Sequence, residues 1–307
     1  MREVLKTNNP VRLDFAQVLL ADAGIDAEIF DAHMSVMDGS LGILPRRLMV
    51  PDDQFARAEA ILREGLAGPA QLQADRFLGG RVIAQQPVGG FRSGLDAVML
   101  AAAVSARAGD TALELGAGAG VASLCLAARV PGCDVTGVEI DAALAEAANA
   151  NARLNAARAK FVRADVFGLP AGLRREFGHV FCNPPFHGDA GETSPDPARA
   201  RALKDGGRLG DWLKAALKRT VSNGTFTAIL RADRMDEALA ALPGTGVTVF
   251  PLWPRAGMPA GRVILSVHKD SRARLVLLPG LVLHAGDGEW SDAADAVLRQ
   301  GAPLDLG

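Results

Sequence analysis

The spacing of hydrophobic and polar residues changes several times along the chain and predicts the order of its first elements. Strands are predicted over residues 2–7, 25–30 and 46–50, where short apolar runs or alternation occur. Helical spacing of Val11, Phe15 and Val18 predicts a helix that Gly24 ends, and a second helix follows Pro51. The order βαββα predicts a small α+β domain over residues 1–66.

The next part of the chain has a different pattern. Residues 67–75 lack a strong period and are predicted to be a linker, so that a second domain covers residues 76–307. Predicted strands there cover residues 111–115, 134–139, 160–163, 179–182, 225–230, 247–250 and 262–268. Predicted helices cover residues 95–107, 120–129, 142–154, 211–220 and 234–242. This alternation is typical of an α/β fold with a doubly wound, mostly parallel sheet, which binds ligands beyond the carboxyl ends of its strands.

Composition narrows the class of protein. The chain has 307 residues, of which 49% are hydrophobic and 22% are charged, as in ordinary globular proteins. The longest apolar run, residues 97–104, is far shorter than the roughly 20 residues that span a bilayer, so we expect no membrane partner. The first residues contain no apolar segment typical of a signal peptide. Three cysteines without CxxC spacing predict neither disulfides nor a metal site, which favours a cytoplasmic location.

Charge is unevenly distributed between the two predicted domains. Residues 1–75 contain seven Lys or Arg and twelve Asp or Glu, whereas the whole chain has a net charge of −2. The first domain contains no recognisable catalytic group of residues. We therefore expect it to bind an unidentified ligand or protein.

A glycine-rich turn follows the first strand of the second domain. Residues 111–121 read TALELGAGAGV, which places Gly116, Gly118 and Gly120 between a strand and a helix. Val121 departs from the GxGxxG fingerprint of nicotinamide-binding proteins, and the spacing is instead that of a turn that binds S-adenosyl-L-methionine (SAM). Glu114 has the charge that suits the ammonium group of this cosubstrate. A simple flexible turn is the alternative.

Acidic residues follow the next two predicted strands. Glu139 ends the second strand, where a carboxylate accepts hydrogen bonds from both hydroxyls of a ribose. Asp165 follows the third strand, where it suits the adenine amine of the same cosubstrate. Each acid alone is also explained as a solvated residue at a strand end. Together with the glycine turn, they favour a SAM site.

The fourth strand leads into the segment Asn183-Pro184-Pro185-Phe186. The two prolines stiffen the backbone and lack N–H donors, which leaves carbonyl oxygens free to accept. The Asn183 side-chain oxygen and the Pro184 backbone oxygen each suit one N–H of an exocyclic amine on a planar ring. Phe186 suits stacking on that ring. A proline-stiffened strand exit without a catalytic role is the alternative.

With these motifs in place, residues 75–307 resemble the bacterial tRNA1(Val) adenine-N(6) methyltransferases. The segments DRFLGGRVIAQQPVGGFRSGLDAVMLAAAV and RVILSVHKDSRARLVLLPGLVLH are similar to that family's opening and closing segments. The resemblance implies a Rossmann-like SAM-dependent methyltransferase fold, SAM as cofactor, and adenosine 37 of a tRNA anticodon loop as substrate. Residues 1–66 resemble a small prokaryotic domain family known only as signal-transducing.

The resemblance also implies which residues form the site. The cofactor would contact Phe91, Arg92, Ser93, Glu114, Gly116, Gly118, Glu139, Ile140, Asp165, Val166 and Asn183. The target base would contact Asn183, Pro184, Pro185 and Phe186. Many relatives have tyrosine in place of Phe186, so stacking is retained and any hydroxyl contact is lost.

Basic residues follow this segment. Arg199, Arg201, Lys204, Arg208, Lys214, Lys218 and Arg219 suit phosphate neutralisation, and His187 suits a contact with substrate RNA. A solvated helix face explains the basic residues equally well, and an exposed loop position explains His187.

Three alternatives remain open at this point. The string NPPFH also resembles rRNA guanine-N(2) methyltransferases. The related string NPPY occurs in enzymes that methylate a protein glutamine. A SAM-binding regulatory protein is the third alternative.

Overall fold

A computed structural model of the chain describes residues 1–7, 10–30, 46–65, 72–88, 92–185, 209–286 and 288–306. The side chains of residues 10–12, 14, 15 and 63–65 lie outside this description. Two compact units, Met1–Gln71 and Leu72–Gly307, are present, and each is described by itself.

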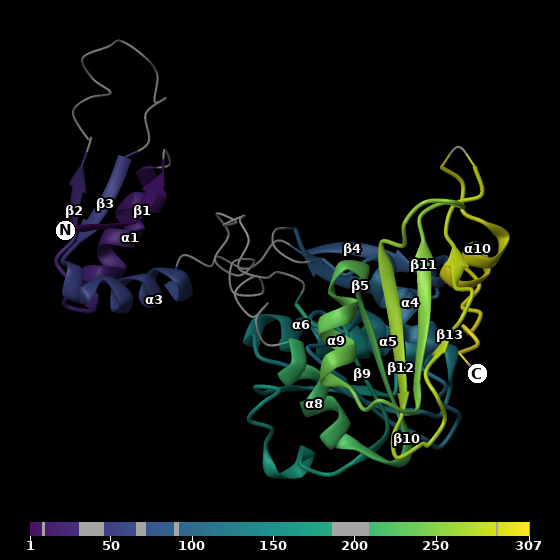
Figure 1. The fold of residues 1–307 in the computed structure, drawn as a ribbon. Coiled ribbons are helices and arrows are strands. Elements are labelled where there is room, and N and C mark those ends of the chain that lie inside the picture. Colours follow the sequence, from purple (N-terminus) through teal and green to yellow (C-terminus); the bar gives the residue numbers. More distant parts are fainter. Residues whose placement is uncertain are drawn as a thin grey trace. The chain divides into compact units, whose positions relative to one another are not determined.

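Within its described residues, the first unit contains a three-stranded antiparallel sheet and two helices (Figure 1). Its strands β1 (Arg2–Thr7), β2 (Glu28–Phe30) and β3 (Arg46–Val50) have the order β1-β3-β2, and its helices are α1 (Pro10–Asp22) and α3 (Phe55–Gly65). Apolar residues of both helices and the central strand form its core, including Leu13, Leu20, Leu48 and Leu62. The order βαββα agrees with the sequence prediction, although β2 is shorter than the predicted strand over residues 25–30.

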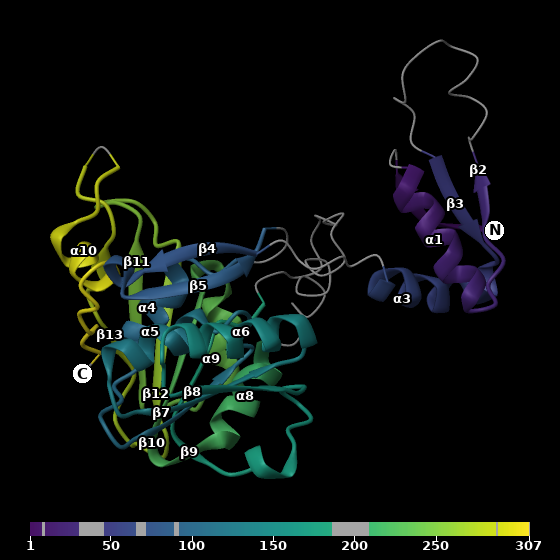
Figure 2. The same ribbon diagram turned by 180° about the vertical axis from the view of Figure 1, so that it is seen from behind.

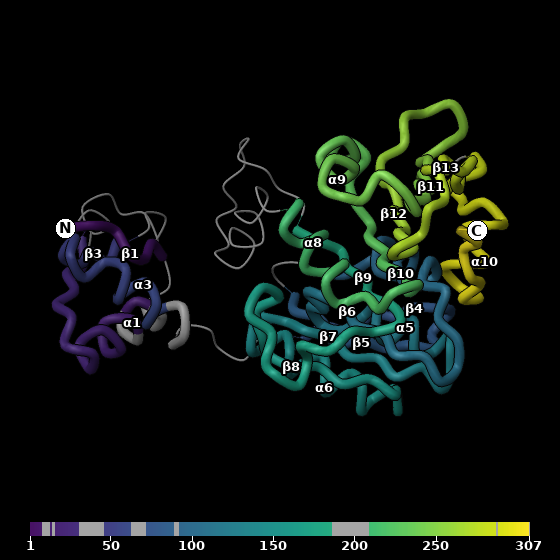
Figure 3. The backbone as a smooth tube through the Cα atoms, turned by 60° about the horizontal axis from the view of Figure 1, so that its bottom comes forward, coloured from purple at the N-terminus to yellow at the C-terminus, as the bar shows by residue number. Residues whose placement is uncertain are grey.

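The second unit contains a nine-stranded sheet within the described residues, in the order β13-β11-β12-β10-β9-β6-β7-β8, with β14 paired to β11 (Figure 3). Its strands are β6 (Thr111–Leu115), β7 (Asp134–Glu139), β8 (Ala159–Arg163), β9 (Phe177–Cys182), β10 (Thr220–Arg231), β11 (Val247–Trp253), β12 (Arg262–His268), β13 (Val276–Leu277) and β14 (Leu281–Val282). Strand β12 is antiparallel to both of its neighbours, and the other pairs are parallel. The sheet is therefore doubly wound and mostly parallel, as predicted.

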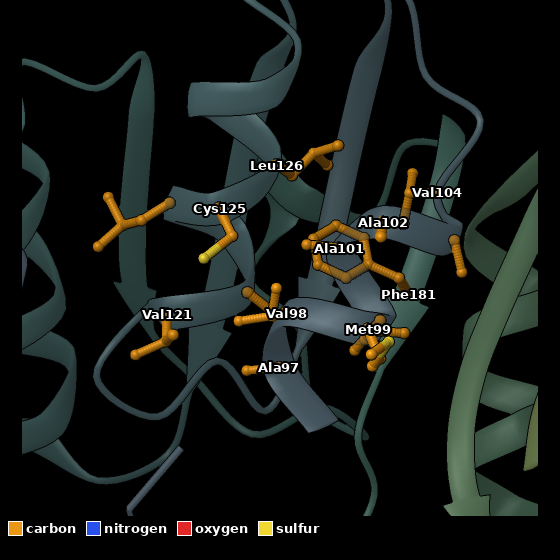
Figure 4. Packing of buried hydrophobic residues seen from close by; sticks show 14 of the residues in the cluster. Ala97, Val98, Met99, Ala101, Ala102, Val104, Val121, Cys125, Leu126 and Phe181 are labelled. Carbon is orange, nitrogen blue, oxygen red and sulfur yellow. The ribbon is translucent and has the colours of Figure 1, made fainter. Parts of the chain in front are cut away.

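Helices cover both faces of this sheet (Figure 3). One face carries α4 (Leu95–Ala103), α5 (Val121–Arg129), α6 (Ala142–Leu154) and α10 (Asp292–Leu298), and the other carries α8 (Leu209–Arg219) and α9 (Met235–Ala241). In Figure 4, Met99 of α4, Cys125 of α5 and Phe181 of β9 pack in one buried cluster. Among helices in the described ranges, none has the length and apolar character needed to cross a membrane.

Two differences from the sequence prediction bear on the site. A two-stranded antiparallel hairpin, β4 (Leu72–Phe77) and β5 (Val82–Pro87), opens the second unit, so residues 72–75 belong to a strand and not to the predicted linker. Most residues of β4 are exposed, and its sequence lacks a sustained alternation of apolar and polar residues that predicts a strand. The helix predicted over residues 95–107 ends at Ala103, where Val104 turns to an extended conformation.

Strand register brings the predicted motifs to one edge of the sheet. Leu115 at the end of β6 pairs with Val138 of β7 and with Cys182 of β9. Glu139 at the end of β7 pairs with Arg163 at the end of β8. The segments after these four strands are therefore neighbours, because parallel strands end at the same edge.

Candidate functional site

The glycine turn after β6 is held by its own backbone amides. Gly116 N and Ala117 N both donate to Val138 O, each at 2.9 Å. Gly118 N donates to Glu139 Oε2 at 2.8 Å. Because these amides already have partners within the protein, the turn is not a cradle for a phosphate. The glycines therefore contribute to the site because they lack a side chain, and not because their amides are free.

The three glycines of the turn have positive φ angles but different surroundings. A Cβ on Gly116 would lie 2.9 Å from the ring of Trp212, and one on Gly120 would lie 2.6 Å from the ring of Phe161. A Cβ on Gly118 would meet nothing within 4 Å. Gly116 and Gly120 therefore allow close packing inside the protein, whereas Gly118 borders open space where a ligand can lie.

The Glu139 carboxylate is buried and held in place by two backbone amides. Its Oε2 accepts from Gly118 N at 2.8 Å, and its Oε1 accepts from Asp141 N at 2.9 Å. Each oxygen keeps a further lone pair for a ligand hydroxyl. The next residue, Ile140, is a large apolar side chain that is 60% exposed.

The segment after β8 provides a second apolar surface at the same edge. Asp165 is exposed, and its Oδ1 accepts from Phe167 N at 2.9 Å. Val166 is buried, and Phe167 is 37% exposed. Since β7 and β8 are adjacent, Ile140 and Phe167 are exposed apolar side chains that follow neighbouring strands. Such side chains can pack against the planar ring of a ligand.

Glu114 lies in the interior of the unit. Its Oε2 accepts hydrogen bonds from the backbone N and the hydroxyl of Ser123, in the first turns of α5. Burial raises the pKa of the Glu114 carboxyl to about 8. The carboxyl thus contributes to the junction between β6 and α5, and its contact with a ligand ammonium remains a prediction.

Arg92 and Ser93 are bound to the β4–β5 hairpin. The Arg92 guanidinium forms two hydrogen bonds with Asp75, at 2.6 and 2.7 Å, and one with Gln73. Ser93 N donates to the Gln86 side chain at 2.8 Å. Phe91, the third predicted residue of this segment, lies outside the described residues. Their contacts with the cofactor remain predictions.

Asn183 follows β9 directly beside the glycine turn, because Cys182 pairs with Leu115. Its Oδ1 atom is buried and accepts no hydrogen bond from any described residue. Pro184 is buried and Pro185 is half-buried. A buried acceptor without a donor is costly, so this atom is suited to a donor on a ligand. The predicted contacts of Phe186 and His187 lie outside the described residues.

Trp212 of α8 also belongs to this region, although its position in an amphipathic helix predicts only a core residue. Its ring packs against Gly116 so closely that a Cβ on this glycine would lie 2.9 Å from the ring. The same ring contacts the Phe167 ring edge-on, with the two centroids 6.0 Å apart. The indole Nε1 is buried, and no described residue accepts its hydrogen. Trp212 is therefore both a core residue and a donor beside the predicted site, which sequence spacing alone did not indicate.

The predicted RNA-binding residues are only partly described. Arg199, Arg201, Lys204 and Arg208 lie outside the described residues. In α8, Lys214 and Lys218 are exposed, whereas Arg219 donates to the backbone oxygen of Arg174. The role of this basic cluster remains a prediction.

The residues at this edge fit SAM. A held carboxylate at Glu139 suits the ribose diol, and Ile140 with Val166 and Phe167 suits the adenine ring. The space next to Gly118 admits a ligand against the backbone. The predicted cofactor residues of β6, β7 and β8 thus come together at one edge.

Comparison with known proteins shows which families this chain resembles. Residues 94–209 match the family model "Methyltransferase small domain", and residues 1–65 match the family "Putative prokaryotic signal transducing protein". The tRNA1(Val) (adenine(37)-N6)-methyltransferase of Aeromonas hydrophila is 30% identical over 210 residues, which cover 65% of this chain and 85% of that protein. The ribosomal RNA small subunit methyltransferase C of the same organism is 36% identical over 93 residues, which cover 30% of this chain and 26% of that protein.

A solved structure has a related fold. The crystal structure of a predicted O-methyltransferase, protein Atu636 from Agrobacterium tumefaciens, matches with a TM-score of 0.58 and 30% identity. The match covers 68% of this chain and 98% of that protein. The sheet is therefore a Rossmann-like methyltransferase sheet. Since the Aeromonas relative is matched over most of its length, the chain belongs to the tRNA1(Val) (adenine(37)-N6)-methyltransferase family.

Proposed function

We propose that the protein transfers a methyl group from SAM to the exocyclic amine of adenine in RNA, at adenosine 37 of a tRNA anticodon loop. The family supports this reaction. Within the structure, the proposal rests on Asn183 Oδ1, which is buried next to the glycine turn and has no partner among the described residues. An amine donor on the substrate would satisfy that oxygen.

The residues after β9 act by positioning. Asn183 Oδ1 accepts one N–H of the target amine, and the Pro184 backbone oxygen accepts the other. These two bonds hold the nitrogen at a fixed place and direction beside the cofactor site. The prolines keep the acceptors rigid because their φ angles are restricted. No residue need remove a proton first, since the amine nitrogen loses its proton after alkylation.

The residues of β6, β7 and β8 bind the cofactor. SAM, when bound, supplies a methyl group activated by a sulfonium. Glu139 would accept hydrogen bonds from the ribose hydroxyls, and Ile140 and Val166 would contact the adenine ring. Gly118 allows close approach because it has no side chain.

A labelling experiment tests the proposed substrate. The purified protein is incubated with methyl-labelled SAM and total tRNA from cells that lack the modification, and the RNA is digested to nucleosides. We expect the label in N6-methyladenosine. Label only in methylguanosine or only in protein would refute the assignment to tRNA adenine.

A second candidate is the guanine-N(2) methylation of ribosomal RNA. The match to the rRNA methyltransferase of Aeromonas hydrophila favours it, although that match covers only 26% of the relative. The target would again be an amine on a planar ring, so Asn183 would have the same role. The nucleoside digest separates the two, and a labelled glutamine in protein would indicate the third substrate class.

We propose that the first unit regulates or tethers the enzyme and does not contact RNA phosphates. Residues 1–75 carry an excess of acidic residues, which repel phosphates. This unit also has a hydrophobic core of its own. A chain that begins at Leu72 should keep its methylation rate and tRNA affinity. A large loss of tRNA affinity would contradict this role.

A further inference from the structure

Helix α6 contains asparagines that act as partners for strand edges. Asn149 pairs with the backbone of Phe161 in the outer strand β8, accepting from Phe161 N at 3.0 Å and donating to Phe161 O at 2.8 Å. Asn151 of α6 and Asn155, the residue directly after this helix, have the same type of pairing with another strand. We call these three residues the asparagine clamp. In Figure 2, α6 lies between β8 and the β4–β5 hairpin, as this pairing requires.

The other two residues of the clamp bind β5. Asn151 accepts from Gln85 N at 2.8 Å and donates to Gln85 O at 3.0 Å. Asn155 accepts from Ile83 N at 2.9 Å and donates to Ile83 O at 2.7 Å. Four residues of helix rise about 6 Å and two residues of strand about 6.6 Å, so the two pairs are in register. The two asparagines thus replace a neighbouring strand along β5.

Asn151 differs from Asn155 in one respect that concerns the cofactor site. Its Nδ2 also donates to Ala119 O of the glycine turn at 3.0 Å, and the residue is fully buried. On the other side of the turn, Glu139 accepts from Gly118 N. The backbone of Gly118–Ala119 is therefore held from two directions. Within the described residues, the Asn155 side chain is bonded to Ile83 and to Asn151 O, the latter at 2.7 Å, and not to the turn.

The strand bound by Asn151 also holds Ser93. Gln86, the residue after Gln85, is buried and accepts from Ser93 N at 2.8 Å. Its Nε2 donates to Ser93 O at 3.0 Å and to Asp75 at 2.8 Å. Hydrogen bonds thus connect Ala119 through Asn151 and β5 to Ser93.

We propose that Asn151 is a positioning residue of the cofactor site, which sets the place of the glycine turn relative to the Ser93 segment. This inference rests on the proposed function only for the identity of the cofactor. Ala119 O and Gln85 lie on separate elements, and one buried amide binds both. A side-chain amide with all its bonds made inside the protein is rigid, so it fixes the distance between the elements it joins.

The test compares two variants that lose the same type of pairing with β5. Asn151→Ala removes the bonds to both β5 and the turn, whereas Asn155→Ala leaves the bond between Asn151 and the turn. We expect a Kd for SAM at least about tenfold higher in Asn151→Ala and within about twofold of the parent in Asn155→Ala, by titration calorimetry. The KM for tRNA and the kcat at saturating SAM should change less than about threefold in both.

Thermal unfolding of each variant shows whether lost stability explains the result. Equal losses of SAM affinity in the two variants, or an unchanged affinity in Asn151→Ala, would overturn the proposal. If Asn151→Ala does not fold, Asn151→Ser takes its place, because a hydroxyl is too short to join both elements. SAM binding is measured without RNA, so a wrong substrate assignment leaves this test intact.

Discussion

The two halves of the candidate site differ in how their polar groups are satisfied. On the side of β6 and β7, the amides of Gly116, Ala117 and Gly118 and the Glu139 carboxylate have partners inside the protein. On the side of β9 and α8, Asn183 Oδ1 and Trp212 Nε1 are buried without a partner among the described residues. The two sides nevertheless meet, because β6 and β9 are paired strands.

We call the side of β6 and β7 the cofactor half of the candidate site, and the side of β9 and α8 its substrate half. The cofactor half is built before any ligand arrives, since its hydrogen bonds already fix its geometry. The substrate half leaves one buried acceptor and one buried donor, each of which costs free energy until a ligand pairs with it. Binding of the substrate would therefore recover energy at the atoms that position its reacting group.

The largest effect is expected when the acceptor of the substrate half is removed, which tests whether the two halves have separate roles. Asn183→Ala should lower kcat for methyl transfer by at least about 10²–10³-fold, as loss of a preorganised polar contact does in other enzymes. SAM affinity, measured by calorimetry, should fall much less, because the cofactor half is intact. Asn183→Asp keeps an acceptor and should retain more activity. Full activity in the alanine variant would refute the role of Asn183.

Two glycine substitutions distinguish ligand space from internal packing within the cofactor half. Gly118→Ala and Gly120→Ala both place a side chain at a positive φ, which costs about 1–2 kcal/mol each. Only Gly118→Ala should weaken SAM binding, by about tenfold or more, because its Cβ would enter the ligand space. Gly120→Ala should lower the free energy of unfolding by about a further 1–3 kcal/mol, because its Cβ would clash with the Phe161 ring. Chemical unfolding and calorimetry measure the two effects, and the reverse pattern would contradict them.

The interior acid of the cofactor half predicts a pH dependence of stability. Burial raises the pKa of Glu114 to about 8 in the folded state, from 4.5 in the unfolded chain. The folded state thus keeps a proton that the unfolded chain releases, and the resulting stabilisation is complete below pH 4.5 and is lost as the pH rises to about 8. Glu114→Gln should remove a slope of at most about 1.4 kcal/mol per pH unit.

Urea unfolding between pH 5 and pH 8 measures this slope, since the unfolded-state pKa of 4.5 and the folded-state pKa of about 8 bracket that window. The exposed Glu289 provides a matched control, because Glu289→Gln should leave the slope unchanged. An identical slope in Glu114→Gln and the parent protein would mean that Glu114 is ionised in the folded state.

The smallest effect concerns the donor of the substrate half. Trp212→Phe keeps a ring against Gly116 and Phe167 but removes the indole N–H. We expect kcat/KM for tRNA to fall by about three- to tenfold, which corresponds to one neutral hydrogen bond, with SAM affinity unchanged. Steady-state kinetics with each substrate varied in turn gives this result. Unchanged kinetics would indicate that Nε1 has a partner elsewhere in the protein.

Local sequence predicted the buried elements well and the exposed ones poorly. The predicted strands over residues 111–115, 134–139 and 262–268 have the observed bounds, and most of their residues are buried, as expected for strands covered on both faces. The hairpin of β4 and β5 was missed, because β4 is mostly exposed and pairs with β5 alone. Strand β5 is also hydrogen-bonded to Asn151 and Asn155, which are 66 and 72 residues away in the sequence from the residues that they bind.

The sequence by itself determined the order of the motifs: a glycine turn, two acids and an Asn-Pro-Pro segment, each at the end of a strand or within two residues after it. Only the tertiary structure decided which partner each group has. It turned Glu114 toward Ser123, bound Arg92 to Asp75, and placed Trp212 on the glycine turn. The physical reason is that strand ends follow from local periodicity, whereas a hydrogen-bond partner depends on which distant residues the packed sheet brings within about 3 Å.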